Sequence, residues 1–333
     1  MSTEQNQQAL TVPVLFIAFN RYDTASQVLD AIRQARPTRL YFACDGPRNE
    51  TERAKCEHVR SLAQSVDWPC EVFTKFSDVN LGVRMGEATA MTWFWENEEM
   101  GIVLEDDTYP AQSFFPYCQE LLHKYKDDER VWAIMGTNLA ERGSGGRDDS
   151  YHYSAHGYGA YWGWAGWRRV WQQYDVDMKD WPALRDGGLI DGHFLSRAER
   201  NEVHKLFEHT WNGDIRSWDY QFDMGRITNH AMNIVPRLNL IRNIGFGAEG
   251  THTTNANDRR GREGVAEIDL PLTHPVHMLV DVAWDKDYFQ RFVRPTAFRR
   301  FKNAMKNVLP EGVDEAITPV LSKLQDKLGI NRD

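Results

Sequence analysis

Apolar and polar residues alternate in blocks along the first 105 residues. Residues 12–19 (VPVLFIAF) are a nearly unbroken apolar run, which is typical of a strand buried on both faces of a parallel sheet. Shorter apolar runs follow at 40–44 and 101–104, and a further strand is predicted at 70–76 between them. Stretches with apolar residues at helical spacing separate these segments. This β-α-β-α-β-α-β order predicts an α/β fold with a mostly parallel sheet flanked by helices. Ligands of such sheets bind in the crevice beyond the carboxyl ends of the strands.

The pattern changes after residue 105. Pro110 suits the first position of a helix, and residues 131–136 form a further apolar strand. Residues 151–250 mix helical and strand patterns without a second β-α-β repeat. Residues 288–310 carry six basic residues and no acidic one, with apolar residues on one helical face. A basic amphipathic helix there fits either an anionic membrane surface or the acidic body of the protein.

The composition narrows the class of protein. With 41% hydrophobic and 26% charged residues, the chain has the balance of a packed globular protein. A net charge of −9 argues against nucleic acid as the main partner. The polar N-terminus lacks the apolar core of a signal peptide, and no run approaches the roughly 18 apolar residues of a membrane span. These features predict a cytoplasmic protein, with peripheral contact at the inner membrane face as one reading of the basic segment.

Three consecutive carboxylates, Glu105, Asp106 and Asp107, come directly after the apolar run at 101–104. Carboxylates at the edge of the crevice cannot all be buried without a counter-charge. Oxygen ligands suit Mg²⁺ or Mn²⁺, with a phosphate completing the coordination shell. The pattern therefore predicts a divalent-metal site centred on Asp107, and a solvated acidic turn is the alternative.

The acidic triplet and its surroundings resemble the GT-A glycosyltransferases, whose short acidic DxD motif follows the fourth strand and binds a metal-bound diphosphate. The closer resemblance, over about residues 12–225, is to the N-acetylglucosaminyltransferase I family, in which an acidic EDD triplet precedes a proline and then two aromatic residues. Here EDDTYP at 105–110 is followed by FFPY at 114–117. The chain also resembles bacterial family-2-like transferases.

This resemblance implies a GT-A, Rossmann-like fold at 10–255, with a nucleotide-sugar-binding half at 12–107 and an α+β acceptor half at 131–255. Residues 256–333 would form a C-terminal helical extension. The implied enzyme uses Mn²⁺ or Mg²⁺ to move a hexosyl or N-acetylhexosaminyl group from a nucleotide-sugar donor to a glycan or lipid-linked acceptor, in surface polysaccharide assembly. The alternatives are a metal-dependent nucleotidyltransferase and a non-catalytic nucleotide- or glycan-binding module on the same fold.

Polar residues near the strand ends are candidates for contacts with the nucleotide sugar. The resemblance assigns the nucleobase and ribose to the loops that hold Arg21 and Asp45. Asp45 can accept a hydrogen bond from a pyrimidine imide, and Arg21 offers a planar fork of donors. Arg84 at a helix start is a candidate phosphate contact, and Asp106 belongs to the same group. Capping and turn chemistry is the alternative for Arg21 and Asp45, and a plain surface position is the alternative for Arg84.

An aromatic block at 158–171 (YGAYWGWAGWRRVW) needs an explanation of its own. Trp164, Trp167 and Trp171 recur at helical spacing, which predicts the core face of a helix. The glycines between the rings instead favour a closely approaching loop, in which flat aromatic side chains suit sugar faces. We predict that Trp162 or Trp164 contacts sugar and that Trp171 lies in the core.

Asp219 lies between Trp218 and Tyr220, ahead of a helical stretch. Apolar surroundings raise the pKa of a carboxylate toward the value that suits a general base. The resembling family has a Trp-Asp-Asp-Trp motif at the corresponding place, whose carboxylate deprotonates the acceptor hydroxyl, and Asp219 is the matching residue. We predict that Asp219 is the catalytic base, with a helix N-cap as the alternative.

His252 follows a glycine-rich segment that begins at Asn243. Many GT-A enzymes use a late histidine as a metal ligand or diphosphate contact, and this resemblance makes His252 a candidate metal ligand beside Asp107 and Glu105. The N-acetylglucosaminyltransferase I pattern has no such histidine, so the role of His252 stays open.

Overall fold

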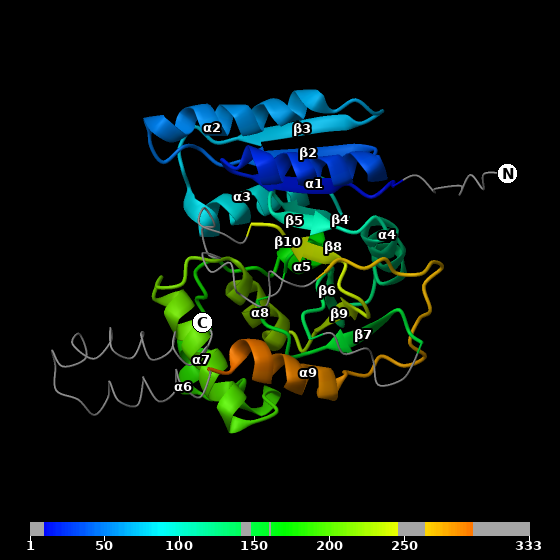
Figure 1. Ribbon diagram of the computed structural model, residues 1–333. Helices are drawn as coiled ribbons and strands as arrows, with labels where there is room; N and C mark the ends of the chain where they lie inside the picture. Colours follow the sequence, from blue (N-terminus) through cyan, green and yellow to red (C-terminus); the bar gives the residue numbers. More distant parts are fainter. Residues whose placement is uncertain (1–9, 141–147, 160, 246–263, 296–333) are drawn as a thin grey trace, which may run out of the picture.

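The computed structural model describes residues 10–140, 148–159, 161–245 and 264–295. Its main feature is an eight-stranded sheet, whose strands run from β3 at the top of Figure 1 to β7 near the bottom in the order β3-β2-β1-β4-β8-β6-β9-β7. The strands of this sheet are β1 (Val14–Ala18), β2 (Arg39–Cys44), β3 (Glu71–Phe76), β4 (Met100–Glu105), β6 (Val131–Met135), β7 (Tyr151–Ser154), β8 (Trp164–Trp167) and β9 (Met232–Pro236). Two short strands, β5 (Thr108–Pro110) and β10 (Ile241–Asn243), form a separate antiparallel pair.

Helices and helical turns connect the strands and cover the sheet. The α-helices are α1 (Tyr22–Ala35), α2 (Glu50–Ser61), α3 (Gly82–Asn97), α4 (Phe114–Lys124), α5 (Arg168–Trp171), α6 (Trp181–Asp186), α7 (Arg197–Trp211), α8 (Asp219–Thr228) and α9 (Val282–Tyr288). Short 3₁₀ turns span Leu62–Ser65 and Asp191–His193, and a π-helical turn spans Phe289–Val293.

The sheet is mixed, and its two halves differ in strand direction. The pairs β1–β2, β2–β3 and β1–β4 are parallel, as the apolar runs of the first 105 residues predict. In the other half, β6–β9 is parallel, whereas β4–β8, β6–β8 and β7–β9 are antiparallel. The α/β class is therefore confirmed, and the expectation of a mostly parallel sheet holds for the first half of the fold.

The order of the first four strands creates a crevice. The chain passes from β1 to β2 to β3 in one direction and then returns past β1 to β4. Right-handed crossovers then place α1 and α2 on one face of the sheet and α3 on the other. The contacts agree, because α1 packs against α2, while α3 packs against β1, β2 and α5. The reversal leaves a topological switch point between the carboxyl ends of β1 and β4, which is where open α/β sheets bind ligands.

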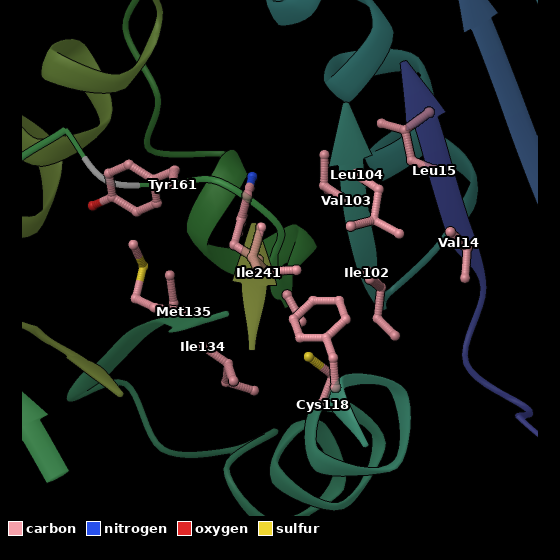
Figure 2. Packing of buried hydrophobic residues seen from close by; sticks show 14 of the residues in the cluster. Val14, Leu15, Ile102, Val103, Leu104, Cys118, Ile134, Met135, Tyr161 and Ile241 are labelled. Atoms are coloured by element: carbon pink, nitrogen blue, oxygen red, sulfur yellow. The ribbon is translucent and has the colours of Figure 1, made fainter. Parts of the chain in front are cut away.

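Apolar side chains fill the space between the central strands and α4. Figure 2 shows Val14 and Leu15 of β1 beside residues 102–104 of β4, with Cys118 of α4 below them and Ile134 of β6 to one side. All of these residues are buried. Because both strands carry apolar residues on both faces, the carboxyl ends of β1 and β4 are held rigidly next to each other.

Two local predictions were wrong. Pro110 does not open a helix: it ends β5, where it faces Ile241 of β10, and α4 begins at Phe114. The helical spacing of the tryptophans was also misleading, because Trp164–Trp167 is strand β8, paired with β4. Short apolar runs fit either period, and pairing in the sheet decided between them.

The two edge strands of the sheet, β7 and β3, differ in whether another segment pairs with them. The β7 edge is covered, because Val280 forms a bridge with Tyr153 and the N–H of Asp281 donates to the Tyr153 carbonyl at 2.8 Å. The N–H of Ser150 donates to the carbonyl of Thr273, also at 2.8 Å. Among the residues that the structure describes, no segment pairs with the outer side of β3.

Candidate functional site

An ion-paired cluster occupies the switch point between β1 and β4. Arg21, directly before α1, donates to Asp106 Oδ1 at 2.6 Å and to Asp107 Oδ2 at 2.8 Å. The N–H of Phe19 donates to the other oxygen of Asp106 at 3.1 Å. Burial disfavours the charge on Arg21, but the two carboxylates outweigh it and raise the Arg21 pKa. The sequence predicted these residues as site residues, and the fold brings all three together.

The two aspartates differ in what they can still bind. Both oxygens of Asp106 are occupied by donors of the chain, so Asp106 orients Arg21 and the turn after β4. Burial, partly offset by Arg21, raises the pKa of Asp106 to about 6. Asp107 gives one oxygen to Arg21, while its Oδ1 is buried without a hydrogen-bond partner. A buried, unpartnered carboxylate oxygen costs free energy unless a ligand supplies the missing contact.

The strand β10 continues into a segment that lies directly on this cluster. The N–H of Ile244 donates to the backbone carbonyl of Asp107 at 2.8 Å, and the N–H of Gly245 donates to Asn243 Oδ1 at 2.9 Å. A Cβ atom at position 245 would collide with Asp107 and would lie 2.6 Å from Arg21 Nη1. Only glycine allows the backbone this approach.

We expect Gly245→Ala to displace the ion pair of Arg21 and Asp107 and to lower the free energy of unfolding by about 1–3 kcal/mol, because a methyl group enters a filled space. Thermal unfolding of purified variants measures this. Gly192→Ala is the matched control, since a Cβ there would meet nothing within 4 Å. Equal melting temperatures for the two variants would contradict the packing described above.

Further carboxylates surround the ion-paired cluster. Burial, followed by repulsion from Asp107 and Asp106, raises the pKa of Glu105 well above its usual range. Burial, followed by repulsion from Glu105 and Asp219, does the same to the pKa of Glu87 on α3. These carboxylates lie within electrostatic reach of one another, and Arg21 alone does not balance their charge. Their raised pKa values mean that these carboxylates hold protons unless a further counter-charge is supplied, and a bound divalent cation would supply it.

The carboxylate oxygens of Asp107 and Glu105 are the kind of donor that a hard divalent cation prefers. Asp107 Oδ1 has no partner, and the Glu105 carboxylate lies on the same turn. In the described part of the chain, no three His, Cys, Asp or Glu side chains are already arranged as a metal cluster. Mg²⁺ and Mn²⁺ sites often take only one or two carboxylates, with water and phosphate oxygens completing the shell.

Asp219 is the first residue of α8 and is half-buried. It accepts hydrogen bonds from the Ser217 hydroxyl and, at 3.0 Å, from the N–H of Tyr220. Burial, together with repulsion from Asp223, raises the pKa of Asp219 from 3.8 to about 7. A pKa near 7 suits a general base near neutral pH, and the role of Asp219 as the catalytic base stays a prediction. The residue at the N-cap is Trp218, so Asp219 does not cap α8.

A buried network fixes the loop that faces Asp219. Asp223 is fully buried; it pairs with Arg226 at 3.1 Å and accepts hydrogen bonds at 2.8 Å from the N–H of Gly159 and the hydroxyl of Tyr161. Gly159 has a φ of +64°, and a Cβ there would lie 3.1 Å from Asp219 Oδ2. The loop therefore needs glycine both for its backbone angle and for its approach to Asp219.

Asp45 and Arg84 are engaged with the chain itself. Asp45 accepts from the backbone N–H groups of Gly46, Leu81 and Gly82, and from the Asn80 side chain at 2.9 Å. This is the turn chemistry that the sequence left as an alternative, and it uses the lone pairs of both carboxylate oxygens. Arg84 donates to the carbonyl of Val176 and lies 3.8 Å from Asp177. Contacts of Asp45 and Arg84 with a nucleotide sugar stay predictions.

The tryptophans divide into core and accessible positions. Trp164 is 1% exposed and stacks on Trp218, so no ligand reaches its ring in this structure. Trp162 is half-buried, which leaves it as the candidate for a sugar contact. Trp171 lies in the core, as predicted.

Two predictions fall partly or wholly outside the described residues. His252 lies outside them, so its role as a metal ligand stays a prediction. Of the basic segment 288–310, the structure describes only the first part, where Arg291 pairs with Asp287 at 2.9 Å. No described helix is both long enough and apolar enough to cross a membrane.

Sequence reasoning missed three residues of the site region. Glu87 is the only acidic residue of α3 before its last turn, and an isolated acid in such a helix was a usable signal. Asp223 and Arg226 are spaced like an ordinary surface ion pair on a helix, and nothing in the sequence indicates that both are fully buried.

No family model matches the chain, and no curated protein matches it. Solved structures with partial similarity include HddC from Yersinia pseudotuberculosis and the same protein complexed with GMP-PN. The sequence identities are 11% and 9%, and the TM-scores are 0.32 and 0.29. Each match covers 49% of this chain and 80% of the other. A likeness at this level carries no argument about function.

Proposed function

We propose that this chain is a metal-dependent glycosyltransferase of the GT-A kind, which moves a sugar from a nucleotide-diphosphate donor to a hydroxyl of a glycan or lipid-linked acceptor. The observation that carries the proposal is the buried, unpartnered Oδ1 of Asp107 at the switch point of the sheet. A second carboxylate, Asp219, supports it, because its pKa of about 7 suits proton abstraction. The setting that the sequence resemblance favours is surface glycan assembly.

Asp107 and Glu105 would hold the cation, and Asp106 with Arg21 would keep the turn in place. A bound divalent cation would neutralise the charge that builds on the leaving diphosphate. Asp219 would accept the proton of the acceptor hydroxyl while the acceptor oxygen bonds to the anomeric carbon and the bond to the diphosphate breaks. A single base suits one direct displacement, so we propose inversion of the anomeric configuration.

A panel of nucleotide sugars, assayed with Mn²⁺ and with a chelator, tests the proposal on the full chain. We expect metal-dependent release of a nucleoside diphosphate that increases when acceptor glycans are added. Release of pyrophosphate from a sugar phosphate and a nucleoside triphosphate would instead support a nucleotidyltransferase. Silence with every donor would support a non-catalytic binding module.

A further inference from the structure

The outer strand of the sheet, β3, has no described segment paired with its outer edge, and most of its side chains are exposed. Its burial differs from that of every other strand of the main sheet, since five of its six residues are exposed. Phe73 and Phe76 are each 38% exposed, and Val79 just beyond the strand is 64% exposed. An exposed, apolar edge strand is a template for pairing with another strand unless the protein protects it. Within the described ranges, the chain covers the opposite edge, β7, and leaves the edge of β3 unpaired.

The backbone of β3 offers hydrogen-bonding groups at alternate positions. The N–H of Glu71 donates to Thr38 and the N–H of Ser77 donates to Cys44, so the odd-numbered residues of β3 bond to β2. In a strand the even-numbered residues then point their N–H and C=O groups outward. Val72, Thr74 and Phe76 therefore carry the free edge.

The side chains of β3 are complementary to a second copy of the same strand. If two β3 strands pair antiparallel about an axis at Phe73, Val72 lies opposite Thr74 of the other copy, and Glu71 lies opposite Lys75. The pair of Val72 and Thr74 is a hydrogen-bonded one, because both point outward. Phe73 faces its own symmetry mate, and each Glu71 faces an opposite charge. Shifting the register to an axis at Val72 or Thr74 would lose this pairing of charges.

We propose that two copies of this chain form a two-fold dimer through antiparallel pairing of their β3 strands, which joins the two sheets into one. A two-fold axis makes the interface isologous, so the contact of Glu71 with Lys75 occurs twice. Phe73, which stacks on Tyr41, and the rings beside it supply the apolar contact on the α3 side. The switch-point cluster lies on β1 and β4, and the dimer leaves it open.

Sedimentation velocity or light scattering of the full chain tests the dimer. We expect a mass of about twice 38.6 kDa that declines on dilution. The variant Thr74→Pro removes one outward N–H without touching the bonds to β2, a position where an edge strand tolerates proline. We expect this variant to be monomeric, with an unchanged circular dichroism spectrum.

Charge reversals test the register independently of folding. Glu71→Lys alone and Lys75→Glu alone place like charges opposite each other twice per dimer, and we expect each to raise the dissociation constant about tenfold or more. Combining the two substitutions exchanges the charges and should restore the dimer. Lys55→Glu, at an exposed position of α2, is the matched control and should leave the dimer intact.

Two results would overturn the proposal. One is a wild-type chain that stays monomeric up to about 100 μM. The other is a dimer that survives Thr74→Pro and both single charge reversals, because its interface would then lie elsewhere.

Discussion

Asp219→Asn is expected to lower turnover by about 10² to 10⁴ while donor affinity stays close to that of the wild type. The amide keeps the size of the side chain but cannot accept a proton, and general-base catalysis has this weight. Steady-state transfer rates and donor affinity by calorimetry measure the two quantities. A variant that transfers sugar at more than about a tenth of the wild-type rate would remove Asp219 from the mechanism.

The pH dependence gives this prediction a second readout. Asp219 must be deprotonated to act as a base, so the wild-type rate should rise with pH and level off above about 7. The free energy of unfolding should change in the opposite direction and fall as the pH rises. The folded state binds the Asp219 proton more tightly than the unfolded state, in which the pKa is 3.8, so this contribution to stability is lost as pH rises from about 4 to about 7.

Asp219→Asn has no such loss. We therefore expect the melting temperature of Asp219→Asn to exceed that of the wild type by a few degrees at pH 8. At pH 4 the two melting temperatures should be equal. Asp127→Asn, at an exposed position, should change neither the rate nor the melting temperature. If Asp219→Asn transferred sugar at the wild-type rate but had a lower melting temperature than the wild type at pH 8, Asp219 would be a purely structural residue.

Asp107→Ala is expected to abolish metal-dependent binding of a nucleoside diphosphate and to leave the fold intact. Arg21 keeps its 2.6 Å contact with Asp106, so the change does not leave an unpaired buried charge. The substitution also removes a buried oxygen that has no partner in the protein. Titration calorimetry with Mn²⁺ and a nucleoside diphosphate measures the loss, and circular dichroism checks the fold.

The control for Asp107→Ala is Asp127→Ala, whose side chain is 87% exposed. This variant should bind Mn²⁺ and the nucleoside diphosphate as the wild type does. If Asp107→Ala also binds both with wild-type affinity, Asp107 is not the metal ligand and the proposed function loses its main support.

The first half of the fold was predictable because its strands are buried on both faces. Residues 12–19 and 101–104 are almost entirely apolar, and such runs, repeated between helical patterns, predict the buried strands of a parallel sheet. The positions of the acidic triplet and of Arg21 at strand ends followed from the same pattern. Their direct ion pair did not, because it depends on β4 lying next to β1, and the order of strands in a sheet is a tertiary property.

The second half of the fold could not be predicted in the same way, because its structure depends on contacts between distant segments. Trp164 fits a helical and an extended pattern equally well, and only its pairing with β4 decides the matter. Asp223 and Arg226 have the spacing of a solvated helix face, yet both are fully buried because the loop at 155–159 supplies backbone partners. Burial of this kind depends on contacts between segments that are distant in sequence.

The hydrogen bonds of Asp45 also help to hold the protein together if its backbone is cut. They join residue 45 to residues 81 and 82, and so close a ring of the polypeptide that contains α2 and β3. A protease that cuts this ring at the exposed Asp67 would leave two pieces still held together by the hydrogen bonds of Asp45 and by the pairing of β2 with β3 and of β1 with β4. The nicked protein should migrate as one species under native conditions and separate into two fragments only on denaturation.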